Sequence, residues 1–477
     1  NNSSSVIEDG YFVREDIDVG AKNLIIHLNN QGYLRARLQS IRADYNDKRD
    51  RVQVMIVIDE GPLTQLNTIS FEGLQSFSPD QLLSELEIKV RSPLRLNQLE
   101  NSILKLKEFY TSRGFIEMKL LNEDETLINY DQKGLSANVN FKIQEGPQVF
   151  VKSITIRGNT FTKNYVIEKE LGIDVGDLLT PEVIDEAQKR LDKLAIFSNI
   201  EISTLEAQTA VSQRTLIVSV TEKNPGLFKM GAGMTNKRTL TARGFAGLSY
   251  NNLWGTARAV SLRGTLENNL VEQNRLEYET SISYLEPFIF GKRLRGRTNY
   301  THSEQITEGS QNINTADTLN IKDTVSFTLE KDLTSKMKFS WLLWGLDSNE
   351  KSDVPNKGPP NRLSRLDIAY IGPTLDFEFR DNPFLPTEGF FSRWDAVYSH
   401  PDLGSSDRVE FIRTQGTVSH YLRLFSPNFI WANSISGGYG KNLDPNGTNP
   451  DPTKKSGIPE SFSFFLGGAT PVRGYSG

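Results

Sequence analysis

Cysteine is absent from this chain of 477 residues, and histidine is rare. Without cysteine the chain can form no disulfide, no thiolate metal site and no cysteine nucleophile. The four histidines are scattered, and none has the spacing to aspartate or glutamate that is typical of a metal site; they are His27, His302, His400 and His420. We therefore predict no metal site.

Long hydrophobic runs are also missing, since mean hydropathy is −0.42 and only 37% of the residues are apolar. No stretch approaches the length of a membrane-spanning helix. That leaves a soluble multidomain protein or a β-barrel, whose alternating strands escape hydropathy averages. The net charge of −5 gives no reason to expect nucleic acid as a partner. The first residues, Asn1 to Ser5, do not form a signal peptide.

No catalytic motif is found. The glycine-rich run Gly231-Ala232-Gly233 lies in a strand pattern rather than before a helix, so a phosphate-binding loop is not predicted. We therefore predict that the chain is not an enzyme and that it needs no cofactor.

The first half of the chain is a repeat. Glu60-Gly61-Pro62 recurs as Glu145-Gly146-Pro147, and Ser70-Phe71-Glu72-Gly73 matches Thr155-Ile156-Arg157-Gly158. A third unit closes near Glu222. Each complete unit reads as strand, helix, helix, strand, strand, which predicts a three-stranded sheet with two helices on one face. We expect the closing Glu-Gly pairs to shape turns. The sheet edge is the part that could bind an extended peptide as an added strand.

The helices of the two complete units have clear boundaries. In the middle unit one helix follows Ser78-Pro79, and the next is predicted from Asn97, with Glu100 placed for a capping box. Its apolar stripe is Leu99, Ile103, Leu106 and Tyr110. Strands are predicted at 66–71, 116–121 and 136–143. In the third unit Thr180-Pro181 begins the second helix, whose stripe is Ile184, Ala187, Leu191 and Leu194.

The first unit is incomplete. Residues 10–12 correspond to residues 176–178, so the chain begins between the two helices of that unit, and we expect it to be part of a longer protein. The predicted domains are a partial α+β repeat at 1–62, complete α+β repeats at 63–148 and 149–224, and a β-domain at 225–477.

After Pro225 the helical stripes stop and strand patterns follow. In one strand Leu276, Tyr278, Thr280, Ile282 and Tyr284 alternate with polar residues. We predict eleven strands, at 227–235, 244–250, 257–266, 275–284, 294–302, 324–331, 337–345, 366–379, 390–400, 409–424 and 429–440.

Every second connection between these strands is short, and the others are mostly longer and polar. This asymmetry is typical of an outer-membrane β-barrel. The short turns contain aromatic residues that fit an interfacial girdle, namely Trp254, Phe288, Phe290 and Phe384. A soluble sandwich of hairpins has the same period of two and remains the alternative.

The last stretch, from residue 441, is predicted to be the sixth loop on the long-loop side. An up-and-down barrel whose two ends lie on the same side needs an even number of strands. Eleven strands cannot close such a barrel, so we expect closing strands beyond Gly477. The loop is apolar at its base, at Phe465, Leu466, Gly467 and Gly468. Farther along, one arginine lies among small residues, in Val472, Arg473, Gly474 and Tyr475.

POTRA-like α+β repeats, then an antiparallel transmembrane β-barrel, then these two loop motifs, in this order, resemble the BamA/TamA superfamily of outer-membrane protein assembly factors. The segment from Asp376 to Pro383, with Pro386 to Gly389, looks like a hairpin common in that family. The resemblance implies a barrel of sixteen strands in the bacterial outer membrane, repeats in the periplasm, and a sixth loop folded into the lumen. It also implies that Arg473 contacts an acidic residue on a later strand, beyond Gly477.

The resemblance further implies that the first barrel strand pairs poorly with the last. We therefore predict a seam strand made of Leu227, Phe228, Lys229, Met230, Gly231, Ala232 and Gly233. Glycine weakens strands, although relief of barrel curvature is an equally good reason for these glycines. An opened seam could template an incoming strand, because backbone groups left unpaired in lipid are costly.

The leading hypothesis is therefore an assembly factor of the BamA type. It would receive unfolded outer-membrane proteins through its repeats and promote their insertion into the lipid bilayer, with periplasmic accessory lipoproteins as further partners. A TamA-type translocation and assembly factor is the nearest alternative. A two-partner-type secretion pore is another, but two repeats would be expected there and parts of three are present. A passive porin would need neither the repeats nor a lumenal arginine.

Overall fold

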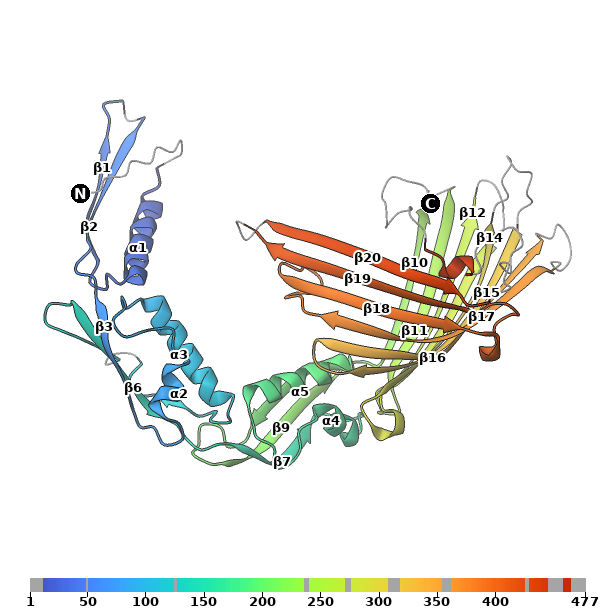
Figure 1. The fold of residues 1–477 in the computed structure, drawn as a ribbon, viewed down its shortest axis with the longest axis horizontal. Helices are drawn as coiled ribbons and strands as arrows, with labels where there is room; N and C mark the ends of the chain where they lie inside the picture. Colours follow the sequence, from blue (N-terminus) through green and yellow to red (C-terminus); the bar gives the residue numbers. More distant parts are fainter. Residues whose placement is uncertain are drawn as a thin grey trace. The chain divides into compact units, whose positions relative to one another are not determined.

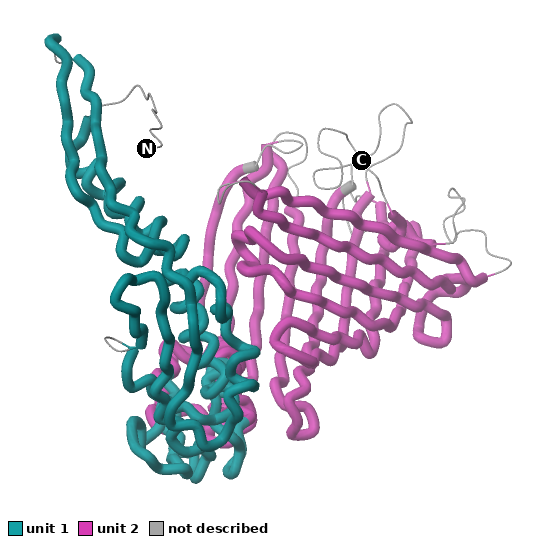
Figure 2. Tube along the Cα trace, turned by 60° about the vertical axis from the view of Figure 1, so that its left-hand side comes forward, with its two compact units in different colours: residues 1–155, 173–185, 201–218 teal, residues 156–172, 186–200, 219–477 magenta. Residues whose placement is uncertain are grey.

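The computed structural model describes residues 12–48, 50–123, 127–235, 240–270, 276–307, 318–353, 362–424, 429–444 and 458–464. The chain divides into two compact units, which are described separately (Figure 2). The first comprises residues 1–155, 173–185 and 201–218, and the second comprises the remainder. No helix in the described ranges is long and apolar enough to cross a membrane.

The repeats follow the predicted order of elements (Figure 1), except that the middle one has an additional short strand at 128–130, so its sheet has four strands and not the predicted three. The first contains α1 (Arg14–Gln31), β1 (Arg37–Tyr45) and β2 (Val52–Asp59). The middle one contains β3 (Gln65–Glu72), α2 (Pro79–Leu83), α3 (Leu96–Thr111), β4 (Lys119–Leu120), β5 (Ile128–Tyr130) and β6 (Ser136–Gln144). The third contains β7 (Phe150–Arg157), α4 (Asn164–Leu171), α5 (Pro181–Lys193), β8 (Phe197–Thr204) and β9 (Gln213–Glu222).

The helix stripe of the middle repeat is confirmed as its core. Leu99, Ile103, Leu106 and Tyr110 are all buried, and they pack with β-strand residues such as Val139 and Phe141. In the sheet β6 is central, parallel to β3 and antiparallel to β4 and β5. The sheet of the third repeat has the corresponding order β7-β9-β8.

The closing glutamates carry out the same task in both complete repeats. The Glu145 carboxylate accepts hydrogen bonds from the backbone N–H groups of Gln75 and Ser76 and from the Tyr110 hydroxyl. In the third repeat the Glu222 carboxylate likewise accepts backbone hydrogen bonds from the loop after the first strand. The turn-shaping role predicted from the repeat is thus a specific one: each glutamate fixes the loop that follows β3 or β7.

The second half forms one eleven-stranded antiparallel sheet in sequence order, from β10 to β20. This confirms the predicted strand number and excludes a two-sheet sandwich for the described strands. The strands are β10 (Gly226–Thr235), β11 (Thr241–Leu253), β12 (Arg258–Asn269), β13 (Leu276–Glu286), β14 (Arg295–Thr307), β15 (Thr318–Asp332), β16 (Met337–Asp353), β17 (Arg362–Glu378), β18 (Gly389–Ser399), β19 (Phe411–Arg423) and β20 (Ile430–Asn442). Short 3₁₀ turns lie at η1 (Ile289–Gly291), η2 (Pro401–Leu403) and η3 (Glu460–Phe462).

The strand register separates an apolar face from a polar face. Directly paired residues share a face, and one row runs from Phe228 through Leu248 and Leu262 to Ile282. On the opposite face a parallel row contains Ser249, Ser261, Ser283, Asn299 and Ser326. Such alternation, apolar toward lipid and polar toward the lumen, is the pattern of a membrane barrel.

Two local predictions were wrong. Helix α3 begins at Leu96, with Arg95 at the N-cap and no capping side chain, whereas Asn97 lies inside the helix. The capping box is at α2 instead, where Ser78 and Gln81 bond each other's backbone. The strand predicted at 116–121 is reduced to Lys119–Leu120, because Phe115 and Met118 turn into the core before pairing begins.

Candidate functional site around the edge strand and the sixth loop

Strand β10 contains the predicted seam residues and is one end of the described sheet. All ten of its residues pair with β11, from Gly226 opposite Tyr250 to Thr235 opposite Thr241. Only Lys223, Asn224 and Pro225 separate it from β9, the last strand of the repeats. The edge strand is therefore the direct continuation of the third repeat.

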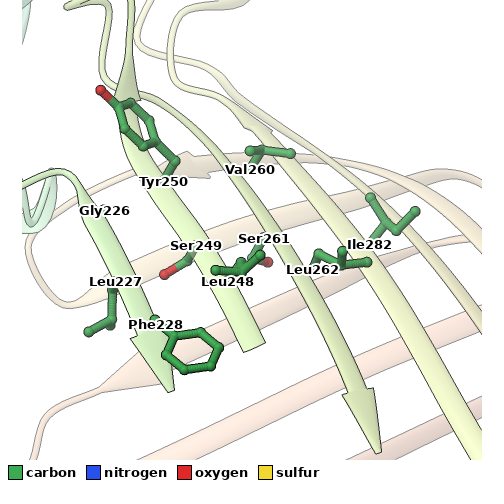
Figure 3. A pocket seen from close by; sticks show the side chains of 10 residues that line it. All are labelled: Gly226, Leu227, Phe228, Leu248, Ser249, Tyr250, Val260, Ser261, Leu262 and Ile282. Atoms are coloured by element: carbon green, nitrogen blue, oxygen red, sulfur yellow. The ribbon is translucent and has the colours of Figure 1, made fainter. Parts of the chain in front are cut away.

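The apolar face of β10 is poorly covered. The side chains of Phe228, Met230 and Met234 are 57%, 75% and 72% exposed. Beside them an open groove of about 580 Å³ crosses β10 to β13, and it is almost entirely apolar (Figure 3). Its lining residues are Gly226, Leu227, Phe228, Leu248, Ser249, Tyr250, Val260, Ser261, Leu262 and Ile282. A surface of this kind is suited to contact with lipid chains or with apolar side chains of another strand.

The glycines of β10 differ in their surroundings. A side chain at Gly231 would overlap the ring of Phe245, whereas the space at Gly233 is open. Gly231 is thus needed for packing against β11, whereas no neighbouring atom requires a glycine at position 233.

The third repeat contacts the β11–β12 turn through a pair of buried side chains. The Asn252 side-chain amide donates to Thr162 Oγ1 at 2.8 Å, and both residues are less than 5% exposed. The Lys163 backbone N–H donates to the Gly255 carbonyl at 2.8 Å. At Gly255 φ is +71°, and a Cβ there would overlap the Phe161 carbonyl. The turn therefore needs a glycine at this position.

The carboxylate of Glu222 stabilises the loop that makes this contact. It accepts hydrogen bonds from the backbone N–H of Thr160, Phe161 and Thr162, the last at 2.6 Å. Partial burial raises the pKa of Glu222, but the hydrogen bonds from Thr162 and Thr160 outweigh it and lower the pKa to about 2. The group is therefore ionised at neutral pH.

Two further short turns contact the same repeat. The Lys169 ammonium of α4 lies 5.7 Å from the centre of the Phe288 ring, in the β13–β14 turn. The Lys193 ammonium of α5 forms an ion pair with Asp332 at 2.9 Å, and Arg295 reaches the same carboxylate at 2.8 Å. Three successive turns, after β11, β13 and β15, thus contact elements of the third repeat. Sequence reasoning identified neither Asn252 nor Thr162, since nothing in the local pattern links positions so far apart.

The loop motifs predicted from the sequence lie outside the described residues. These are Phe465 to Gly468 and Val472 to Tyr475, including Arg473. Within the predicted sixth loop the structure describes residues 441–444 and 458–464, and in the second of these segments Phe462 is buried against Tyr370 and Phe411. Phe464 begins the apolar stretch noted in the sequence, whereas Phe462, two residues earlier, was not singled out.

The treatment of the histidines as scattered needs correction for His302. Its Nδ1 lies 2.8 Å from Asp323, and its Nε2 lies 3.6 Å from Glu304, two residues along the same strand. The two carboxylates contact opposite nitrogens of the ring, so they do not converge on one point. In the described part of the chain no group of three or more potential ligands is arranged to hold a metal ion.

Comparisons with known proteins agree with this architecture. Residues 252–477 match the family model of the Omp85 superfamily domain, and residues 65–146 and 149–223 match that of the POTRA surface-antigen repeat. The chain is 22% identical over 486 residues to the outer membrane protein assembly factor BamA of Nitratidesulfovibrio vulgaris, covering 99% of this chain and 55% of that protein. It is 21% identical to the BamA of Neisseria meningitidis, covering 94% and 54%.

A solved structure shares the fold. The crystal structure of BamA from Haemophilus ducreyi lacking POTRA domains 1–3 superposes with a TM-score of 0.58 at 17% identity, covering 87% of this chain and 76% of that one. The chain spans about half the length of the curated relatives it matches.

Proposed function

Because the chain belongs to the Omp85 superfamily of outer-membrane assembly factors, we propose that it receives unfolded β-barrel proteins at its POTRA repeats and promotes their insertion at strand β10. The barrel lies in the outer membrane and the repeats lie in the periplasm. The polar face of the sheet then lines the lumen, and the apolar face meets lipid.

The observation that carries the proposal is the position of β10. It follows β9 after three residues, and it is the described sheet's edge strand. In this proposal a client bound as an added strand at a repeat passes to this edge and not through the lumen. Backbone N–H and C=O groups at a strand edge bind an incoming strand independently of its sequence, which suits a site with many clients.

Gly233 adds no side-chain packing to β10, which would favour opening of this edge. Beyond its ladder with β11, the strand exposes Phe228, Met230 and Met234 on the apolar face, and no atom lies within 4 Å of a Cβ position at Gly233. Each backbone group freed by opening in lipid costs free energy unless it is paired again. An arriving strand supplies that pairing, so the edge acts as a template.

Folding kinetics of an unfolded test barrel in liposomes would test the proposal. The full-length protein should accelerate folding. Gly233→Thr should reduce this acceleration, because a β-branched residue stabilises a strand relative to glycine by up to about 1 kcal/mol. A more stable β10 would open less readily. The matched control is Gly264→Thr in the interior strand β12, where space around the glycine is equally open; it should leave the acceleration unchanged.

The other functions predict different results. A secretion pore would give large ion conductance or passage of a secreted client into the liposome, with no faster folding of the test barrel. A TamA-type factor would accelerate only a restricted class of clients, so several unrelated barrels should be compared. Accessory lipoproteins of the periplasm are further expected partners. Their contribution would be measured by adding detergent-solubilised outer-membrane lipoproteins to the same reaction.

A further inference from the structure

The polar face of the sheet carries one apolar patch near the outer end of β17 to β19. It consists of Leu366, Ile368, Tyr370, Val397 and Phe411. In the same cross-strand rows on β15 and β16, the residues are Lys322, Thr324, Asp347 and Asn349, with an ion pair between Lys322 and Asp347 at 3.1 Å. The patch is thus a local exception within a polar lumen.

Residues 458–464, a described segment of the sixth loop, cover this patch. The Phe462 ring lies 5.1 Å from Tyr370 in an edge-on arrangement and 5.1 Å from Phe411. Ile458 packs against the same cluster, in which Ile368, Val409 and Phe411 are fully buried. Edge-on and tilted aromatic pairs of this kind are favourable beyond the area that they bury.

Phe464 occupies a second position, which glycines on β20 leave free. A Cβ at Gly438 would overlap the Phe464 ring, and one at Gly440 would lie 2.7 Å from Ile458. The guanidinium of Arg413, opposite Gly440 on β19, lies 4.7 Å from the centre of the Phe464 ring. Gly438, Gly440 and Arg413 together form a shallow binding site on the barrel wall for Phe464 and Ile458.

We propose that Phe462 and Phe464 are an aromatic anchor that fixes the sixth loop to the β17–β20 wall, independently of Arg473. The anchor lies nine positions or more before Arg473 in the chain, so it can hold residues 458–464 on the wall without any contact from the arginine. Phe462 and Phe464 are therefore positioning residues. They hold the loop on β17–β20, at the other end of the described sheet from the edge strand β10. The loop therefore stays with β17–β20 when the β10 edge opens.

Labelling of a single cysteine would test this anchor. The chain has no cysteine, so Ser463→Cys provides a unique thiol between the two rings. Its rate of reaction with a membrane-impermeant maleimide would be measured in folded full-length protein, without any client. Phe462→Ala should raise the rate on the order of tenfold, which corresponds to about 1.4 kcal/mol of lost anchoring. Phe462→Leu should restore most of the protection.

A double-mutant comparison distinguishes the loss of the contact between Phe464 and Gly438 from a general loosening of the loop. Gly438→Ala should raise the labelling rate in the presence of Phe464 and have no further effect combined with Phe464→Ala, because the clashing ring is then gone. Its neighbour Gly437 faces the other side of β20 with no atom within 4 Å, so Gly437→Ala is the matched control and should change nothing. The proposal would be overturned by additive effects of Gly438→Ala and Phe464→Ala, or by unchanged labelling in Phe462→Ala. Full release by Arg473→Ala alone would also overturn it. No client is used, so a negative result would leave the proposed function standing.

Discussion

The side-chain amide of Asn252 donates a buried hydrogen bond to Thr162 Oγ1 over 2.8 Å. This bond connects the first short turn of the barrel to the loop after β7, and that loop in turn is bonded to the Glu222 carboxylate. The third repeat and the β11–β12 turn are therefore coupled through two layers of hydrogen bonds.

Thr162→Val should weaken this coupling by about 1–3 kcal/mol, because it leaves a buried amide donor without its acceptor. Hydrogen exchange of the backbone amides at residues 159–163 should accelerate accordingly. The control is Thr334→Val, whose hydroxyl bonds only within its own turn. Equal exchange in both variants would mean that the Asn252 bond contributes nothing to the coupling.

The contact between the middle and third repeats depends on a buried ion pair. Arg214, 1% exposed, bonds Glu117 at 2.6 Å, and its remaining N–H groups donate to the carbonyls of Thr209 and Val211. Glu117→Ala should destabilise this junction by about 3–5 kcal/mol, because it leaves a buried guanidinium without its carboxylate. The loss would be measured by unfolding the protein in urea, with hydrogen exchange of the backbone amides of residues 205–218 as the readout.

Two comparisons test the reason for that loss. Combining Glu117→Leu with Arg214→Met removes both charges and should recover much of the stability. Lys107→Ala removes a solvent-exposed ion pair with Glu123 and should leave the unfolding midpoint unchanged. A loss in Lys107→Ala as large as in Glu117→Ala would show that burial is not the cause.

The loop after β7 should loosen in acid. The pKa of Glu222 is lowered from 4.5 to about 2, so the folded state binds fewer protons than the unfolded state in that window. Its stabilisation is fully present above pH 4.5 and is lost as the pH falls toward 2. Hydrogen exchange at residues 160–162, corrected for the intrinsic effect of pH, should report this loss. Glu222→Gln should remove the pH dependence, and a wild-type profile that stays flat from pH 5 to 2 would contradict the assignment.

Much of the fold follows from sequence periodicity. The stripe of Leu99, Ile103, Leu106 and Tyr110 indicated a helix with one buried face, and the alternation around Ile282 indicated a strand with two different faces. These patterns are local, because a helix or strand repeats its environment every few residues. The alternation of short and long connections then gave the sheet order.

What could not be predicted are contacts between distant residues. Arg214 meets Glu117, and Phe464 covers Gly438, only because the fold brings together strands and loops far apart in the chain. The capping box was assigned to Asn97 because its spacing to Glu100 fits, yet Arg95 lies at the N-cap of that helix. His302 and Glu304 do have strand spacing, but the predicted strand ended at residue 302, so a search for i, i+2 pairs within the predicted strands would have missed Glu304.

Site-specific cross-linking during assembly tests the central claim most directly. A photoreactive group would be placed at Met230 on the apolar face of β10, at Leu262 on the same face of interior strand β12, or at Ser281 on the polar face of β13. An unfolded test barrel would then be added to proteoliposomes. The account predicts transient cross-links to the client from Met230, and few or none from Leu262 and Ser281. Cross-links that arise mainly from Ser281 would contradict it, because they would mean that the client passes through the lumen.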